Sequence, residues 1–189
     1  ITCGMTGLWD TRTIHGGVQN LVSGFRATPS GVATGEWITG STIDGQGSYS
    51  PSVANRHLAA ELISQLGISG SSPRTIFGVC GNDTAAANQA IFTTGIPNPG
   101  EDWSLRRNGA ANDWRVQIFG VTTVDFTLAI PMGGSVKFLL TQNGTAIDCW
   151  INGASRGTGT ATVNTPDATF KIGAWVLAGQ PSWSQPIQF

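Results

Sequence analysis

Charge is scarce in this sequence. Only 11% of the 189 residues are charged, and the formal net charge is −1. The ten basic residues are scattered and form no basic stripe, so nucleic acid is not expected as a partner. No apolar run approaches the roughly 18 residues of a membrane-spanning helix, so membrane insertion is not expected either.

Targeting signals and metal-binding cysteines are also missing. No basic segment followed by an apolar run opens the chain, so no signal peptide is predicted, and the start at Ile1 favours a processed or partial product of a longer protein. Cys3, Cys80 and Cys149 have no spacing typical of a zinc site. Cys80 and Cys149 lie in strand-like runs, which predicts buried free thiols; one disulfide with a spare thiol is the alternative.

Glycine, by contrast, is abundant. The chain contains 26 glycines together with many Thr, Ser and Asn, while 40% of its residues are still hydrophobic. This composition is typical of a turn-rich and strand-rich fold rather than of a disordered chain. No internal repeat or linker is evident, so we expect one domain over residues 1–189, with a loop-rich entry segment over residues 1–40.

Apolar and polar residues alternate with a period of two after residue 70, which predicts a series of strands. The predicted strands are Arg74–Cys80, Gln89–Thr94, Trp103–Arg107, Trp114–Phe119, Thr123–Leu128, Ser135–Thr141, Ala146–Ile151, Thr158–Val163 and Ala168–Leu177. Gly-, Asn- and Pro-rich segments separate them. Strands at this spacing favour a sandwich or jelly roll.

One helix is predicted over residues 54–66. Leu58, Leu62 and Leu66 recur every four residues, and Gly67 follows as a stop signal. A single helix cannot cover a parallel sheet. The expected fold class is therefore all-β: a two-sheet antiparallel β-sandwich (jelly roll) with one short helix.

The alternation also predicts which side chains face away from the core. In residues 146–152 the core face carries Ile147, Cys149 and Ile151, and a turn follows at Asn152-Gly153. The opposite face carries Asp148 and Trp150. Around residue 172 the core face carries Phe170, Ile172, Ala174 and Val176, and the opposite face carries Lys171 and Trp175.

These outward positions form a candidate sugar-binding surface. A carbohydrate-binding module needs exposed aromatic planes with polar side chains beside them. Trp150 and Trp175 supply the planes, and Asp148 and Lys171 lie beside them. Arg115 and Gln117, which alternate against the core residues of their strand, join this surface if the strands are neighbours. The alternative is that loops folded over the sandwich bury both tryptophans.

The segment "VKFLLTQNGTAIDCWINGASRGTGTATVNTPDATFKIGAW" resembles the late half of a laminin-G-like, concanavalin A-like jelly roll. The matching features are Trp150-Ile151-Asn152-Gly153 at a strand end and Ile172-Gly173-Ala174 at a later one. Upstream, "SSPRTIFGVCGN", "NQAIFTTG" and "DWSLRRNGAANDWRVQIFG" resemble earlier strands of the family. The resemblance covers roughly residues 40–189, and the chain ends short of the family's usual last strand.

The resemblance implies two kinds of chemistry to test. Related glucanases carry an E-x-D-x-E pattern that sets an acid and a nucleophile on one strand face. The only glutamates here, Glu36, Glu61 and Glu101, have no carboxylate two residues away, so no catalytic activity is expected. Many laminin-G-like domains bind calcium through loop carboxylates, which makes Asp44 a candidate ligand. The alternative is that Asp44 only stabilises its turn.

The expected role is a non-catalytic binding module on a virion or extracellular surface. Members of the resembled family occur in phage fibres and capsid decorations, and this neutral, Gly- and Thr-rich chain resembles such parts. The expected partners are host glycans or neighbouring virion subunits, in a homo-oligomer. The alternative is a carbohydrate-binding module of a secreted glycoside hydrolase.

Overall fold

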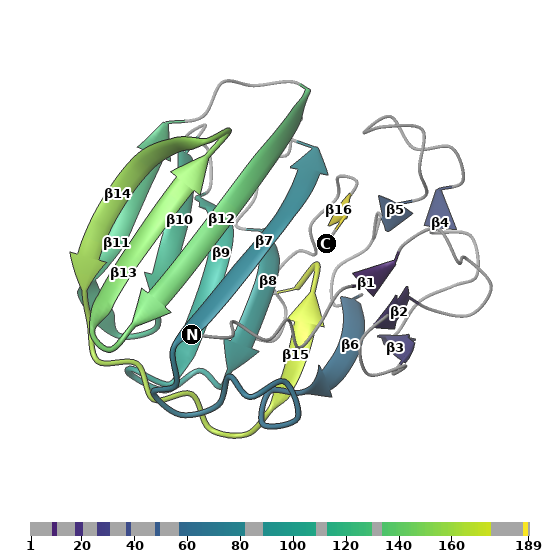
Figure 1. Ribbon diagram of the computed structural model, residues 1–189, viewed down its shortest axis with the longest axis horizontal. Helices are drawn as coiled ribbons and strands as arrows, with labels where there is room; N and C mark the ends of the chain where they lie inside the picture. Colours follow the sequence, from purple (N-terminus) through teal and green to yellow (C-terminus); the bar gives the residue numbers. More distant parts are fainter. Residues whose placement is uncertain are drawn as a thin grey trace, which may run out of the picture.

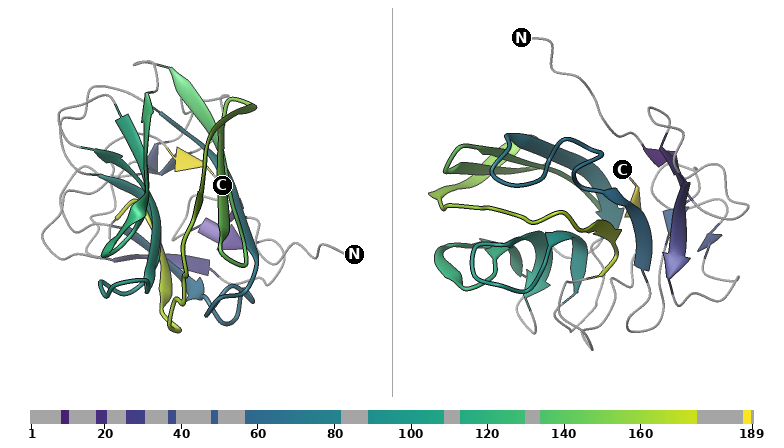
Figure 2. Two further views of the ribbon diagram at one scale, coloured as in Figure 1. Left: turned by 90° about the vertical axis from the view of Figure 1, so that its left-hand side faces the viewer. Right: turned by 90° about the horizontal axis from the view of Figure 1, so that it is seen from below.

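The computed structural model describes residues 57–81, 89–108, 113–129 and 134–174, five short strands before residue 57, and one short strand at residues 187–188. These residues form an antiparallel β-sandwich, the predicted fold class (Figure 1). Figure 2 shows its two sheets edge-on as two layers in the right-hand view.

Nine strands form the first layer, here called sheet I. Their order is β1 (Trp9–Asp10), β2 (Val18–Asn20), β3 (Arg26–Ser30), β6 (His57–Leu62), β15 (Thr169–Ile172), β8 (Ala90–Gly95), β9 (Asp102–Asn108), β10 (Asp113–Ile118) and β11 (Val121–Ala129). Strand β15 is inserted between β6 and β8, which precede it by many residues in the sequence.

Seven strands form the second layer, here called sheet II. Their order is β14 (Ala154–Thr160), β13 (Ala146–Ile151), β12 (Ser135–Asn143), β7 (Arg74–Gly81), β16 (Ile187–Gln188), β5 (Ser48–Tyr49) and β4 (Trp37–Ile38). Strand β12 pairs along nearly its whole length with β7 on one side, and from Phe138 to Asn143 with β13 on the other. This long three-strand centre gives sheet II a regular outer face.

Aromatic side chains join the two sheets across the core. The ring of Phe92, from sheet I, lies 6.2 Å from that of Phe138, from sheet II. It also lies 5.9 Å from Phe170 and 5.7 Å from Trp103, measured between ring centroids. Ring pairs at these separations add packing energy to the burial of their apolar area.

Arg74 lies inside the sandwich rather than on its surface. Its Nη1 donates to Thr165 Oγ1 at 2.7 Å and its Nε donates to the Ser72 carbonyl at 3.1 Å. Its guanidinium carbon lies 5.6 Å from the centroid of the Trp103 ring. Burial lowers the pKa of Arg74 to about 10, because the charged form loses hydration.

The predicted hairpin at Asn152-Gly153 is confirmed. Asn152 has φ 52° and Gly153 has φ 80°, the pair of positive values that a two-residue turn between antiparallel strands requires. The following strand begins at Ala154, directly after this turn, and not at Thr158 as predicted. The core assignments Ile147, Cys149 and Ile151 are confirmed by their burial.

The predicted helix over residues 54–66 is wrong where the structure describes it. Residues 57–62 form β6, which pairs with β3 and β15. Only one turn follows, in which the Leu66 amide donates to the Leu62 carbonyl at 3.3 Å. Gly67 ends that turn with φ 70°. The leucine spacing therefore comes from a strand followed by a turn, and not from a helix face.

The segment expected to be loop-rich contains strands as well. Strands β1 to β4 lie within residues 1–40 and are two to five residues long. Such short strands carry too few alternating positions to be recognised from periodicity.

Candidate functional site

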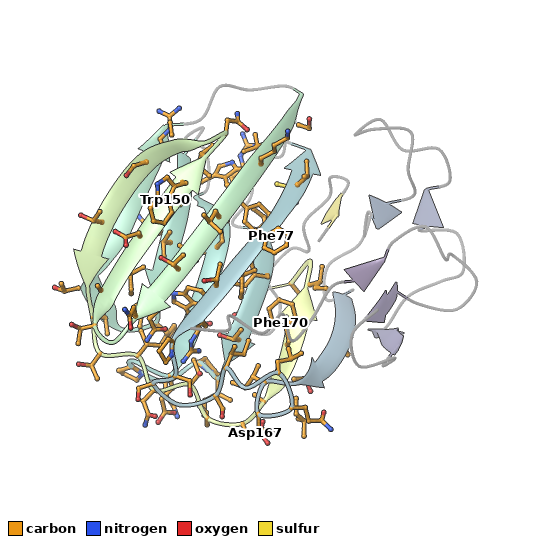
Figure 3. All side chains as sticks on the ribbon, in the orientation of Figure 1. Phe77, Trp150, Asp167 and Phe170 are labelled. Carbon is orange, nitrogen blue, oxygen red and sulfur yellow. The ribbon has the colours of Figure 1, made fainter. Side chains whose placement is uncertain are left out.

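A row of three apolar side chains crosses the outer face of sheet II. Phe77 of β7 is paired with Leu139 of β12, and Leu139 is paired with Trp150 of β13. We call these three residues the aromatic row, after the aromatic side chains at its two ends. Phe77 is 47% exposed, and Leu139 and Trp150 are half-buried. Figure 3 shows Phe77 and Trp150 on their two strands, with β12 between them.

Strand alternation explains why this row faces solvent. Ile76, Leu140 and Cys149 are neighbours of the row residues in sequence, and all three are buried in the core. Successive side chains of a strand point to opposite faces, so the row residues face outward. The three side chains adjoin one another across neighbouring strands and form a contiguous apolar patch, which makes this face a candidate contact surface.

Polar side chains flank the aromatic row on both sides. On one side lies the register row Thr75, Thr141, Asp148 and Thr158, which crosses β7, β12, β13 and β14. On the other side, the Lys137 amide donates to Asn152 Oδ1 at 2.9 Å, and the Asn152 amide donates to the Lys137 carbonyl at 2.8 Å. Apolar surface with hydroxyl, carboxylate and amide groups on either side suits a ligand that is itself both apolar and polar.

The structure brings together only part of the residues predicted to bind sugar. Trp150 and Asp148 both lie on β13 and face outward from sheet II. Lys171 of β15, and Arg115 and Gln117 of β10, belong to sheet I. The condition that their strands neighbour β13 is therefore not met. Trp175 and Asp44 lie outside the described residues.

Sequence reasoning missed Phe77 and Leu139. The signal that identifies Phe77 is the alternation of β7, in which Arg74, Ile76 and Cys80 are buried while Thr75 and Phe77 are exposed. Leu139 stands among three consecutive apolar residues, which hides the alternation, but Lys137 and Thr141, two residues away on either side, mark its face as the outward one.

The outer face of sheet I carries a second group of polar side chains. Lys171, Thr93, Ser104 and Gln117 lie in one register row across β15, β8, β9 and β10. Thr93 Oγ1 donates to Asp102 Oδ1 at 2.6 Å, and Ser104 Oγ donates to Asp102 Oδ2 at 3.2 Å.

This network around Asp102 is inaccessible. Thr93, Asp102 and Ser104 have no exposed surface. Asp102 is the first residue of β9. Because no ligand reaches fully buried atoms, we assign these three residues to stability and not to binding.

The prediction that two cysteine thiols are free and buried is confirmed. Cys80 and Cys149 are both buried and unpaired with each other. Burial raises the pKa of Cys80 well above its ordinary value and that of Cys149 to about 12. Their thiolates are disfavoured at neutral pH, which makes both poor nucleophiles. Cys3 lies outside the described residues.

The described part of the chain contains neither a metal-ligand cluster nor a membrane-spanning helix. No group of three or more His, Cys, Asp or Glu side chains there is arranged to hold a metal ion. Within the same residues, no helix has the length and apolar character needed to cross a membrane.

Comparison with known proteins shows the fold. No protein-family model and no curated protein matches the chain. Domain 4 of AbnA, an extracellular GH43 arabinanase of Geobacillus stearothermophilus solved in complex with arabinotriose, has a TM-score of 0.69 at 14% identity. The match covers 97% of this chain and 88% of that domain.

Trypanosoma rangeli sialidase is also similar, with a TM-score of 0.70 at 13% identity over 98% of this chain. The match covers only 30% of the sialidase, so the chain corresponds to less than a third of that enzyme. A second structure of this sialidase, in complex with the inhibitor DANA, gives a TM-score of 0.68 at 10% identity, over 96% of this chain and 29% of the sialidase. At these identities the comparisons show a shared β-sandwich fold.

Proposed function

We propose that this chain is a non-catalytic carbohydrate-binding module that acts outside the cell, as part of or alongside a glycan-degrading enzyme. The observation that carries the proposal is the aromatic row with polar side chains on both flanks. The likeness to a domain solved with arabinotriose supports the same ligand class.

The chemistry of the row suits a sugar. The C–H bonds on a sugar ring form apolar patches that stack on aromatic side chains such as Trp150 and Phe77. The ring's hydroxyl groups then point sideways, toward donors and acceptors. Thr141 and Asp148 on one flank, and Asn152 on the other, provide such groups within the same face.

The absence of catalysis is part of this proposal. Asp102 is the carboxylate nearest in sequence to Glu101, and it is held by Thr93 and Ser104 without exposed surface. Asp148, beside the aromatic row, has threonines for register partners, namely Thr141 and Thr158. Two accessible carboxylates about 5–10 Å apart, which glycoside hydrolysis needs, are not found on this face of the described strands.

A virion fibre or capsid decoration was the primary expectation from the sequence. Neither the described residues nor the comparisons favour it over an enzyme-associated module. The arabinanase domain and the sialidase are carbohydrate-active proteins, which favours the module. Calcium through Asp44 stays a prediction of the resemblance.

Affinity electrophoresis in gels that contain soluble polysaccharides tests the proposal. Arabinan, xylan, β-glucan and a sialylated glycoprotein serve as the panel. We expect retardation by at least one polymer, and loss of that retardation in Trp150→Ala. Leu62→Ala is the matched control, because Leu62 is 42% exposed but lies on β6 of sheet I.

Two results would contradict the proposal. If no polymer retards the folded wild-type protein, glycan binding fails. If the purified chain releases reducing sugar from a polymer, and Asp148→Asn abolishes that release, the module is catalytic.

A further inference from the structure

We infer that the ligand is an extended, linear, neutral oligosaccharide that lies across the strands of sheet II, and not a terminal sugar. This inference rests on the proposed function and specifies its ligand class. It comes from the direction of the aromatic row, which the register of three strands defines.

The length of the row sets the minimum size of the ligand. Phe77 and Trp150 lie on β7 and β13, which are separated by β12. Neighbouring strands are roughly 4.8 Å apart, so the two backbone positions are about 10 Å apart along the row. A single sugar ring is too short to stack on both aromatic side chains. A ligand that uses the whole row must therefore be a chain of several sugars.

The flank that starts at Thr75 runs parallel to the aromatic row, which favours a chain in the same direction. The register row from Thr75 to Thr158 follows the aromatic row across the same strands and extends onto β14. It places a hydroxyl or carboxylate beside each row position. A linear chain lying on the row has its hydroxyl groups directed at this flank along its entire length, whereas a branched or terminal sugar uses only one position.

Charge near the row favours a neutral chain. Asp148 lies on one flank, Lys137 lies on the other, and Arg156 occupies the bulge of β14 opposite the end of the row. An acidic chain gains from Lys137 and Arg156 but is repelled by Asp148, and a basic chain experiences the reverse. Because charges of both signs lie beside the row, a ligand of uniform charge meets repulsion at one position or another, and a neutral chain does not.

A second copy of this chain is a less suitable occupant. A stable protein interface needs about 800 Å² from each partner. The aromatic row consists of three side chains, of which only Phe77 is largely exposed. The polar flanks on both sides also limit the apolar area that a flat protein surface could cover.

Isothermal titration calorimetry with oligosaccharides of increasing length tests the inference. The probes are arabinose, arabinobiose, arabinotriose and arabinohexaose. Xylose with its oligomers of the same lengths, and cello-oligosaccharides from cellobiose to cellohexaose, form two further series. We expect affinity to rise by about tenfold or more between the monosaccharide and the trisaccharide, which corresponds to about 1.4 kcal/mol or more. Affinity should then level off, and added salt should change it little.

Variants at the two ends of the row make the test specific. Phe77→Ala should reduce the affinity for the trisaccharide to that of the disaccharide, while leaving the monosaccharide affinity unchanged. Trp150→Ala should weaken all lengths, and Trp150→Tyr should restore most of the loss by keeping an aromatic plane. Leu62→Ala again serves as the control.

The outcomes separate the two proposals. If no series binds and no polymer retards the protein, both the proposed function and this inference fail. If glycans bind but the monosaccharide binds as tightly as the hexasaccharide, only the inference fails. If sedimentation velocity shows a dimer that Phe77→Ala dissociates, the row is a self-association surface and the inference is overturned.

Discussion

Thr93 Oγ1 donates a hydrogen bond of 2.6 Å to Asp102 Oδ1, and neither residue has any exposed surface. A carboxylate buried on the outer face of a sheet is costly unless donors surround it. Thr93 and Ser104 supply two such donors from neighbouring strands, β8 and β9. This network therefore ties together the centre of sheet I.

Asp102→Ala should destabilise the fold without affecting the proposed glycan binding. The substitution leaves the hydroxyls of Thr93 and Ser104 buried without this acceptor, which costs about 1–3 kcal/mol. Urea denaturation measures the change in the free energy of unfolding. Thr93→Val, which removes one donor, should cost less. A variant of unchanged stability but altered glycan affinity would show that Asp102 belongs to a binding site.

Two glycine substitutions should differ in severity. Gly153→Ala places a Cβ in open space, so only its positive φ of 80° is unfavourable, at about 1–2 kcal/mol. Gly95→Ala places a Cβ only 1.8 Å from the Glu101 carbonyl oxygen, which forces the backbone to move. Thermal unfolding should give Gly95→Ala a melting temperature well below that of Gly153→Ala. Equal melting temperatures would refute this close approach.

The stability of the fold should fall above pH 9. The Cys149 thiol has an ordinary pKa of 9.0 that burial raises to about 12, so between these values the unfolded chain releases a proton that the folded chain keeps. The contribution of Cys149 is complete below pH 9 and is lost as pH rises through about 12, with a slope approaching ~1.4 kcal/mol per pH unit. Urea denaturation of the wild type and Cys149→Ala at several pH values measures this slope. A variant with the wild-type slope would refute the assignment.

Ile172→Asp should abolish folding. Ile172 is 2% exposed and is paired with Phe92 on one side and with Leu58 on the other. An isolated carboxylate in this buried position loses its hydration, which is costly. Circular dichroism should show an unfolded chain, whereas Lys171→Ser on the opposite face of β15 should stay folded. A folded Ile172→Asp protein would mean that the strand register is shifted by one residue.

Much of the strand pattern could be predicted from the sequence, because burial on one face imposes a period of two. Strands β7 to β13 were all predicted within a few residues of their observed bounds, and Trp150 was correctly placed on the outward face. The helix predicted over residues 54–66 was wrong, because an apolar spacing of four also arises when a strand leads into a turn. Periodicity alone does not separate these two cases over so short a segment.

The grouping of site residues could not be predicted, for a different reason. Alternation states which side of its own strand a residue occupies, but not which sheet the strand joins. Lys171 is paired with Thr93, and Trp150 is paired with Leu139, through contacts between segments distant in sequence. Sheet membership depends on such long-range pairing. The sequence pattern therefore assigned Lys171 and Trp150 to one candidate surface, although they lie in different sheets.

The alternation within β7, β12 and β13 has a consequence for how this surface can change. Ile76, Leu140 and Cys149 hold the sandwich together, while Phe77, Leu139 and Trp150 beside them in sequence face outward. Substitutions at the outward positions leave the inward packing intact. The chemistry of the outer face can therefore change through point mutations, and engineering of that face can proceed without redesign of the interior.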